Sequence, residues 1–295
     1  MIRQLKFAAV ALVFLAGTGL ATLFSEADDA SLRASARSSP AGRAYLGFDR
    51  NEYPGDAAMK TLRHDFAFTS FWLSPPPGDK TGKNTWAGKR EFLHTQGFGF
   101  VVLYRGRDAH ELKNERRAKE LGIIDANSAA SSAKSEGFPK STIIFLDIED
   151  GGRLPNTYHA YLRGFADELA HTSYRAGVYC SGIPVKEEPG SSITTAEDIR
   201  TSEAPREFVF WAYNDACPPS PGCVFPQDAP PPAASGTSFA SVWQFAQSPR
   251  RKEFAAHCPP GYHTDGNCYA PSDAAHTWFL DVNSASSPDP SAGSK

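Results

Sequence analysis

The sequence predicts an α/β protein that folds as a single-domain (β/α)8 barrel of the TIM type. Eight short β-rich runs recur along the chain, and helical patterns separate most of them. Several runs, such as Ile143-Ile144-Phe145-Leu146, are continuously apolar, which is typical of parallel strands covered on both faces. The alternation spans about 240 residues, close to the size of one such barrel. A doubly wound open sheet is the alternative, but no G-x-G-x-x-G or P-loop pattern supports a nucleotide site in that fold.

The individual elements follow from composition and periodicity. The strands are expected at 45–49, 66–73, 99–104, 142–149, 175–180, 208–214, 241–246 and 278–283. The helices are expected at 56–64, 86–95, 119–136, 157–171 and 194–200. In the fourth helix, aromatic and aliphatic residues recur at helical spacing and predict one buried stripe: Tyr158, Tyr161, Leu162, Phe165 and Leu169.

The last two connections differ from the others. Segment 215–240 is rich in Pro and carries Cys217 and Cys223, while segment 247–277 carries Cys258 and Cys268. Neither has a helical period, so the last helices of the barrel are expected to be degenerate and replaced by long loops. Both short Cys intervals suit local disulfides in an oxidising compartment, although the sequence does not fix the pairing. A four-Cys zinc site is disfavoured because neither interval has C-x2–4-C spacing.

The remaining Cys180 is expected to be a buried thiol at a strand end, with a catalytic nucleophile as the second interpretation.

The amino terminus predicts export. A short basic stretch, residues 1–6, precedes eighteen uncharged and mostly apolar residues, and small residues then offer cleavage points after Ala21 or Ala27. This is the layout of a secretory signal peptide at 1–27, with an uncleaved anchor as the alternative. The chain has no twin-Arg pair there, which favours general secretion. Removal of Arg3, Lys6 and Glu26 changes the net charge from −3 to −4.

The expected organisation is a linker at 28–43, the barrel at 44–286 and a disordered tail at 287–295. The protein is expected to be secreted or located in the periplasm or cell envelope, and to be a monomer. It is not expected to contact the membrane after the signal peptide has been cleaved. A hydrophobic content of 41% excludes a disordered chain, and a charged content of 21% with net charge −3 argues against a coiled coil or a nucleic-acid-binding domain. Five Cys are too few for a disulfide-built miniprotein.

The position of the acidic residues is the strongest functional signal. Asp49 ends the first strand, Asp147 and Glu149 end the fourth, and Asp281 lies near the end of the last. In a barrel these strand ends meet at one rim, where catalytic groups sit. Asp147 and Glu149 are two apart on a strand, so both side chains point to one face, with Cα atoms about 6–7 Å apart. Crowded like charges raise a carboxyl pKa, and glycoside hydrolysis requires one protonated acid and one ionised partner.

Each acid also has a structural interpretation. Asp49 is as well explained as a turn or helix cap, and Asp150, followed by two glycines, is explained that way alone. Asp147 and Glu149 are harder to dismiss, because an apolar strand gains nothing structurally from two acids at its end. A divalent metal site is the minority alternative, since no nitrogen cluster accompanies the acids. No metal is therefore expected.

Aromatic and amide side chains near the same strand ends are candidates for sugar binding, because sugars present apolar faces and hydroxyl groups. The candidates are Tyr104, Tyr179, Trp211, Tyr213, Trp243, Gln244 and Asn283. For any one of the aromatics, an ordinary place in the barrel core is an equally good explanation. The loop at 72–78 is expected either to wall the mouth of the barrel or to be a plain Pro-rich turn.

At these residues the chain resembles glycoside hydrolase family 25, the Chalaropsis-type lysozymes that cleave peptidoglycan. It resembles still more closely a related family of secreted bacterial glycoside-hydrolase-like domains whose activity is generally unestablished. The resemblance spans about 44–286 and rests on the order and spacing of these blocks: Gly47-Phe48-Asp49, Asp147-Ile148-Glu149, Gly177-Val178-Tyr179, Trp211-Ala212-Tyr213, Val242-Trp243-Gln244-Phe245 and Leu280-Asp281-Val282-Asn283.

The resemblance implies that Glu149 is the general acid and that Asp147 orients the substrate or stabilises the oxocarbenium-like centre. It implies positioning roles for Asp49 and Asp281, retention of anomeric configuration, and no cofactor. Two features depart from family 25: Arg50 and Asn51 replace a small apolar residue and Ser, and the Cys-bearing loops are not typical. The leading hypothesis is an exported glycosidase acting on peptidoglycan or another extracellular polysaccharide. The alternative is a catalytically inactive barrel that binds cell-envelope glycan.

Overall fold

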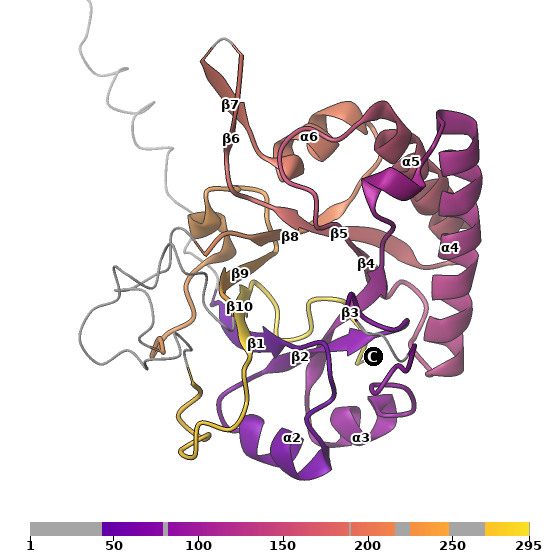
Figure 1. Cartoon of the computed structure of the whole chain (residues 1–295). Coiled ribbons are helices and arrows are strands. Elements are labelled where there is room, and N and C mark those ends of the chain that lie inside the picture. Colours follow the sequence, from indigo (N-terminus) through magenta and orange to yellow (C-terminus); the bar gives the residue numbers. More distant parts are fainter. Residues whose placement is uncertain (1–42, 79–81, 189, 216–224, 248–268, 295) are drawn as a thin grey trace, which may run out of the picture. The chain divides into compact units, whose positions relative to one another are not determined.

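The structure is a computed structural model that describes residues 43–78, 82–188, 190–215, 225–247 and 269–294. Eight strands close into a barrel in the order β1-β10-β9-β8-β5-β4-β3-β2 (Figure 1). Their bounds are β1 Tyr45–Asp49, β2 Phe68–Trp72, β3 Gly99–Arg105, β4 Ile143–Asp147, β5 Arg175–Ser181, β8 Val209–Tyr213, β9 Val242–Ala246 and β10 Asp281–Ala285. The predicted α/β barrel is therefore confirmed.

The barrel differs from the expected all-parallel form in its last strand. β10 lies antiparallel between β1 and β9, whereas the other neighbouring strands run parallel. A parallel last strand requires a crossover that returns the chain to the opposite end of the barrel. Here β9 ends and β10 begins at the same rim, so no such crossover is made. The expected strand at 278–283 was wrong in direction, and the observed strand starts at Asp281.

Five helices connect the strands, close to where the sequence places them: α2 Asp56–Leu62, α3 Arg90–Thr95, α4 Glu115–Ser135, α5 Asn156–His171 and α6 Thr195–Ser202. Asn114 caps α4 by accepting from the Arg117 N–H, and Thr194 caps α6 in the same way from Glu197. After α6 the described residues form no further α-helix and one 3-10 turn, Pro232–Ser235, in agreement with the prediction of degenerate last helices.

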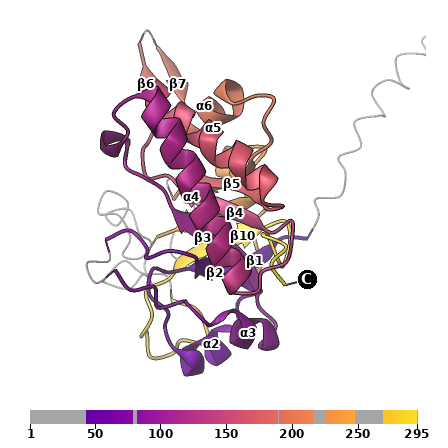
Figure 2. The same ribbon diagram turned by 90° about the vertical axis from the view of Figure 1, so that its right-hand side faces the viewer.

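Helices α4 and α5 pack side by side (Figure 2), and α5 also contacts β5. Their backbones meet at two glycines: a Cβ on Gly122 would lie 2.2 Å from the Tyr161 carbonyl oxygen, and one on Gly164 would lie 2.2 Å from that of Lys119. The predicted apolar stripe of α5 is buried, with Tyr158, Leu162 and Phe165 at most 1% exposed. The close approach of the two helices fixes α5, which follows the loop that carries Glu149.

A short antiparallel hairpin, β6 Val185–Glu187 and β7 Ser191–Ile193, was not predicted. It projects from the barrel between β5 and α6 (Figure 1). Its strands have three residues each and are mostly exposed, so the sequence carries no apolar alternation there. Arg153 ties the hairpin to the β4–α5 connection, with its Nε 2.7 Å from a Glu187 carboxylate oxygen.

The carboxyl-terminal segment differs from the expected disordered tail. Residues 287–294 lie against β3 and β4, and Ser291 is fully buried. The Ser291 N–H donates to the Phe100 carbonyl, its own carbonyl accepts from the Ile143 N–H, and its hydroxyl accepts from the Val102 N–H. Polar composition suggested disorder, but these backbone donors and acceptors at the strand ends need partners, and the segment supplies them.

Other sequence predictions lie outside the described residues: the signal peptide, most of the linker, and the four cysteines at 217, 223, 258 and 268. Cys180 is described, and it is a free thiol that is fully buried. Burial raises its pKa, which opposes a role as a nucleophile. In the part of the chain that the structure describes, every helix is too short or too polar to cross a membrane.

Candidate active site

The four acids predicted from the sequence line one hollow at a single rim of the barrel. The hollow has a volume of about 220 Å³, and its lining includes Asp49, Asp147, Glu149 and Asp281. Asp49 and Asp147 come from the carboxyl ends of β1 and β4, and Glu149 follows two residues after β4. Strands far apart in the sequence therefore deliver these carboxyl groups to one place that solvent reaches.

Asp281 reaches this rim by a route that the sequence analysis did not foresee. It is the first residue of β10 and pairs with Asp49, the last residue of β1. Because β10 runs antiparallel, its beginning lies where the parallel strands end. The predicted neighbourhood of Asp281 is correct, although the strand direction on which it was based is wrong.

Two amide side chains donate hydrogen bonds to the Asp49 carboxyl group. Its Oδ1 accepts hydrogen bonds from the Asn283 Nδ2 at 2.6 Å and the Gln244 Nε2 at 3.3 Å. Asn283 in turn accepts from the Trp211 indole N–H at 2.9 Å, and Gln244 accepts from the Tyr179 hydroxyl. These bonds orient the Asp49 carboxyl toward the hollow without an Arg or Lys partner.

Burial is the main reason that the pKa of Asp49 rises to about 7. The hydrogen bond from Asn283 opposes this rise, whereas the negative charges of Asp147 and Glu149 add to it. Asp49 is only 9% exposed, so water stabilises its charged form poorly. A carboxyl group in this state changes its protonation near neutral pH.

Asp147 and Glu149 form a carboxyl pair. Asp147 is 6% exposed, and burial, together with the charge of Glu149, raises its pKa well above the ordinary value. Glu149 reaches solvent on one side, and protein packed against its carboxyl raises its pKa as well. A hydrogen bond between the two raises the pKa of Asp147 and lowers that of Glu149. The pKa values of both carboxyl groups are therefore raised, and the protonation state of each depends on that of the other.

The neighbouring strand brings its backbone close to this pair. A Cβ on Gly106, just after β3, would lie 2.2 Å from the Asp147 carbonyl oxygen, so only glycine fits there. Positive charge near the pair comes from Arg105, which pairs with Asp147 in the β3–β4 register and lowers its pKa. The sequence analysis did not single out Arg105, because its side of the rim is set by strand register alone.

The predicted sugar-binding side chains divide into three groups. Tyr179 and Trp211 line the hollow, with ring centroids 4.8 Å apart, and Tyr213 packs on Tyr179 at 5.4 Å. Gln244 and Asn283 lie beneath the acids, where they hold Asp49. The third group does not line the hollow and consists of Tyr104 and Trp243.

Strand alternation explains the placement of this third group. Trp243 precedes Gln244, so the two side chains point to opposite faces of β9, and the Trp243 indole N–H donates to the Asn214 carbonyl. Tyr104 likewise faces α5, where its ring lies 6.4 Å from that of Phe165. Its strand neighbour Leu103 lines the hollow instead. The periodicity of β3 could have identified Leu103 from the sequence.

The hollow has further walls from the loops after β1, β2 and β9. Trp72 and Pro77 line it, so the loop at 72–78 does wall the mouth of the barrel. Asn51 also lines it and donates to the Pro77 carbonyl at 3.3 Å, and Gln247 closes the side next to β9. Asn51 was noted in the sequence only as a departure from family 25, and Gln247 had no signal. In the described part of the chain, no group of three or more His, Cys, Asp or Glu is arranged to hold a metal ion.

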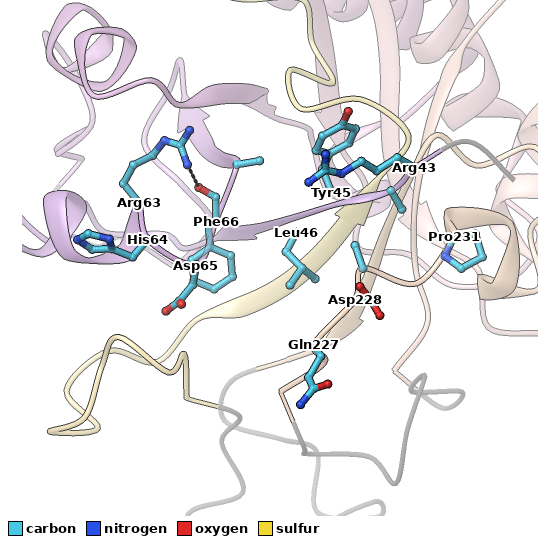
Figure 3. Close-up of a pocket in the computed structure, with 13 residues that line it drawn as sticks. Arg43, Tyr45, Leu46, Arg63, His64, Asp65, Phe66, Gln227, Asp228 and Pro231 are labelled. Carbon is cyan, nitrogen blue, oxygen red and sulfur yellow. Dashed lines mark hydrogen bonds between the residues drawn. The ribbon is translucent and has the colours of Figure 1, made fainter.

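A larger hollow, of about 520 Å³, lies at the opposite end of the barrel, where β1 begins (Figure 3). Two of its charged side chains bond to the backbone: Arg63 donates to the Phe66 and Gly97 carbonyls, and Asp65 accepts from the Ser272 N–H. Residues at this end of a barrel generally serve stability. The smaller hollow with the four acids is therefore the candidate active site.

The fold is a closed eight-stranded α/β barrel with carboxyl groups gathered at one rim. Residues 73–217 match the family model of the Rv2525c-like, glycoside hydrolase-like domain. The predicted relationship is thereby confirmed. The matched segment contains Asp147, Glu149, Tyr179 and Trp211, whereas Asp49 and Asp281 lie outside it.

Solved structures with a similar fold share little sequence with the chain. An uncharacterized B. stearothermophilus protein is 18% identical, with 81% of this chain and 94% of that chain covered and a TM-score of 0.49. The Mycobacterium tuberculosis Tat-secreted protein Rv2525c, in complex with L-tartrate, is 16% identical, with 82% and 94% covered and a TM-score of 0.48. The Clostridium perfringens spore cortex lytic enzyme SleM is 14% identical, with 85% and 69% covered and a TM-score of 0.48. No curated protein sequence matches the chain.

Proposed function

We propose that this protein is a glycosidase that cleaves peptidoglycan or a related extracellular polysaccharide. The observation that carries the proposal is the pair of carboxyl groups of Asp147 and Glu149 at the end of β4, in an open hollow lined by two further acids. Glycoside hydrolysis needs a protonated carboxyl for the leaving oxygen and ionised carboxyl groups near the developing cation. The family model supports the same reaction class.

The two members of the pair differ in their access to solvent, and this difference supports separate roles for them. Glu149 reaches solvent, so it is the member that contacts the glycosidic oxygen and passes the proton to it. Asp147 is buried beneath it and supplies the proton through the hydrogen bond that joins them. The glycosidic bond breaks as the leaving oxygen takes the proton, and the ionised carboxyl groups stabilise the positive charge on the sugar ring. Water then adds to that ring and returns a proton to the carboxyl pair, which restores the starting state.

The protein is proposed to act outside the cytoplasm as a monomer, with residues 1–27 as its signal peptide. The basic, apolar and small-residue regions of that segment support export. Polysaccharide is the proposed partner, and Tyr179 and Trp211 are the proposed aromatic contacts to it. No cofactor takes part in the proposed reaction.

A catalytically inactive glycan-binding barrel is the second candidate, and one observation favours it. Asp147, whose pKa is raised by burial and by the charge of Glu149, lies away from solvent, so a proton held on it does not reach a glycosidic oxygen directly. If a bound sugar does not draw that proton to Glu149, the site binds glycan without cleaving it.

Release of reducing ends from purified peptidoglycan and from soluble chitooligosaccharides separates the two candidates. We expect release by the wild-type protein and its loss in Glu149→Gln, because the amide cannot donate a proton to the leaving oxygen. Glu207→Gln, an exposed acid elsewhere, is the matched control and is expected to retain activity. Binding without release by the wild type would reject the enzyme, and full activity of Glu149→Gln would reject the assignment of the proton donor.

A further inference from the structure

A second hollow adjoins the candidate active site. It has a volume of about 350 Å³ and shares Asp49, Asn51 and Asp281 with the first. Its outer part is lined by Arg50, Glu52 and Phe279. Since the shared residues lie where the two hollows meet, the acids line an elongated depression rather than the end of a closed pocket.

Phe279 is unusual because its ring is exposed. It is 46% exposed and is one of four large hydrophobic residues in the described chain that reach solvent, together with Ile123, Ile124 and Val185. Ile123 and Ile124 lie on α4, whereas Phe279 lies beside the acids, two residues before Asp281. A large exposed apolar side chain beside a polar hollow is a feature of ligand-binding surfaces.

The position of Phe279 is fixed by Arg50. The Arg50 Nη1 donates to the Phe279 carbonyl at 2.9 Å, and its Nε donates to the Glu52 carbonyl at 3.0 Å. The Tyr269 ring lies next to the Phe279 ring, with 6.1 Å between the ring centroids, and it stacks on the His276 ring at a centroid distance of 4.4 Å. Arg50, which follows Asp49 in the sequence, thus connects the end of β1 to the backbone of Phe279 at the outer end of the depression.

We propose that the outer hollow is a second sugar-binding subsite in which Phe279 is the platform for one ring of an oligosaccharide. This inference rests on the proposed function and specifies its ligand as a chain of several sugars that spans both hollows. The apolar face of a sugar ring packs on Phe279, and its hydroxyls bond to Arg50, Glu52 and Asn51. The departure from family 25 at Arg50 and Asn51 then has a role, because these residues build the subsite.

Affinity as a function of ligand length tests the subsite. Titration calorimetry uses the full chain with Glu149→Gln, so that the ligand is not consumed, and chitooligosaccharides from the disaccharide to the hexasaccharide. We expect the affinity to rise in a step once the oligosaccharide fills both hollows. Adding Phe279→Ala is expected to remove that step and to weaken binding of the hexasaccharide about fivefold to tenfold, while binding of the disaccharide changes less than about twofold.

Two further variants in the same background serve as controls. Phe279→Trp keeps an aromatic platform and is expected to retain the step, and Ile124→Ala removes an equally exposed apolar side chain on α4 and is expected to change nothing. Equal loss at every ligand length, or no loss in Phe279→Ala, would overturn the subsite while leaving the proposed function intact. Failure of every oligosaccharide to bind the parent Glu149→Gln protein would overturn the proposed function and the subsite with it.

Discussion

Replacing Asp49 by Asn is expected to stabilise the protein at alkaline pH and to change little at acidic pH. Both hydrogen bonds to Asp49 end on one oxygen, Oδ1, and the carbonyl oxygen of Asn accepts the same two bonds from Asn283 and Gln244. The substitution therefore preserves the shape and the contacts of the side chain. It removes the cost of holding a buried negative charge beside Asp147 and Glu149.

The sign and size of this effect follow from the pKa of Asp49, which folding raises from 3.8 to about 7. The folded protein then binds the proton more tightly than the unfolded chain, so the stability of the wild type falls as the pH rises from about 4 to 7. At about 1.4 kcal/mol per pKa unit, the shift sets a ceiling of about 4 kcal/mol above pH 7. Because neighbouring carboxyl groups also adjust, we expect a gain of about 1–3 kcal/mol at pH 8 and less than about 1 kcal/mol at pH 4.

Urea unfolding of the wild type and Asp49→Asn at pH 4 and pH 8 measures this difference. The exposed Asp228→Asn is the matched control and is expected to change stability by less than about 0.5 kcal/mol at either pH. An equal effect of Asp49→Asn at both pH values, or a loss of stability at pH 8, would refute the argument that burial of this charge is costly.

Further predictions concern the packing around the site. Gly122→Ala is expected to lower the free energy of unfolding by about 1–3 kcal/mol, because the new Cβ meets the α5 backbone and this clash outweighs the helix propensity of Ala, which is about 1 kcal/mol better than that of Gly. Ser131→Ala on the same helix is the control. A gain in melting temperature for Gly122→Ala would contradict the packing argument. Burial tends to lower the pKa of His159, but its bonds to Glu203 and Asp198 outweigh this and raise it. The stabilisation that charged His159 provides is complete below about pH 6.5 and is lost as the pH rises through the pKa of His159 in the folded protein. His159→Gln is therefore expected to cost more stability at pH 6 than at pH 9. Equal costs at the two pH values in denaturant unfolding would argue against an ion pair. Ser291→Ala leaves the Val102 N–H without its partner and is expected to cost about 1–2 kcal/mol, which thermal unfolding measures; no change would mean that the carboxyl-terminal segment does not stabilise the barrel.

The sequence was sufficient to predict the features that depend on local pattern. Continuous apolar runs located the strands, and periodicity located α5 to within one residue. The acid positions at strand ends predicted that Asp49, Asp147 and Glu149 share a rim, since that follows from a closed barrel alone. These predictions need no knowledge of how distant segments contact each other.

The sequence was insufficient wherever contacts between distant segments decide the outcome. The direction of β10 depends on the rim of the barrel at which the preceding loop ends, and the residue types within the strand do not indicate which rim that is. Ser291 is ordered because β3 and β4 present free backbone groups to it, which composition does not reveal. Tyr104 and Trp243 were placed at the site by strand position alone, whereas the alternation of side chains sends them to the other face.

The position of β10 between β1 and β9 has a consequence for biogenesis. The first and last strands are neighbours, and the bond from Asn283 to Asp49 joins residues 234 positions apart. Until residue 285 has emerged from the ribosome, β1 and β9 each keep an unpaired edge, and an unpaired edge invites association with other chains. Premature termination upstream of β10 would therefore yield an open, aggregation-prone sheet that lacks both Asp281 and the Asn283 amide that supports Asp49.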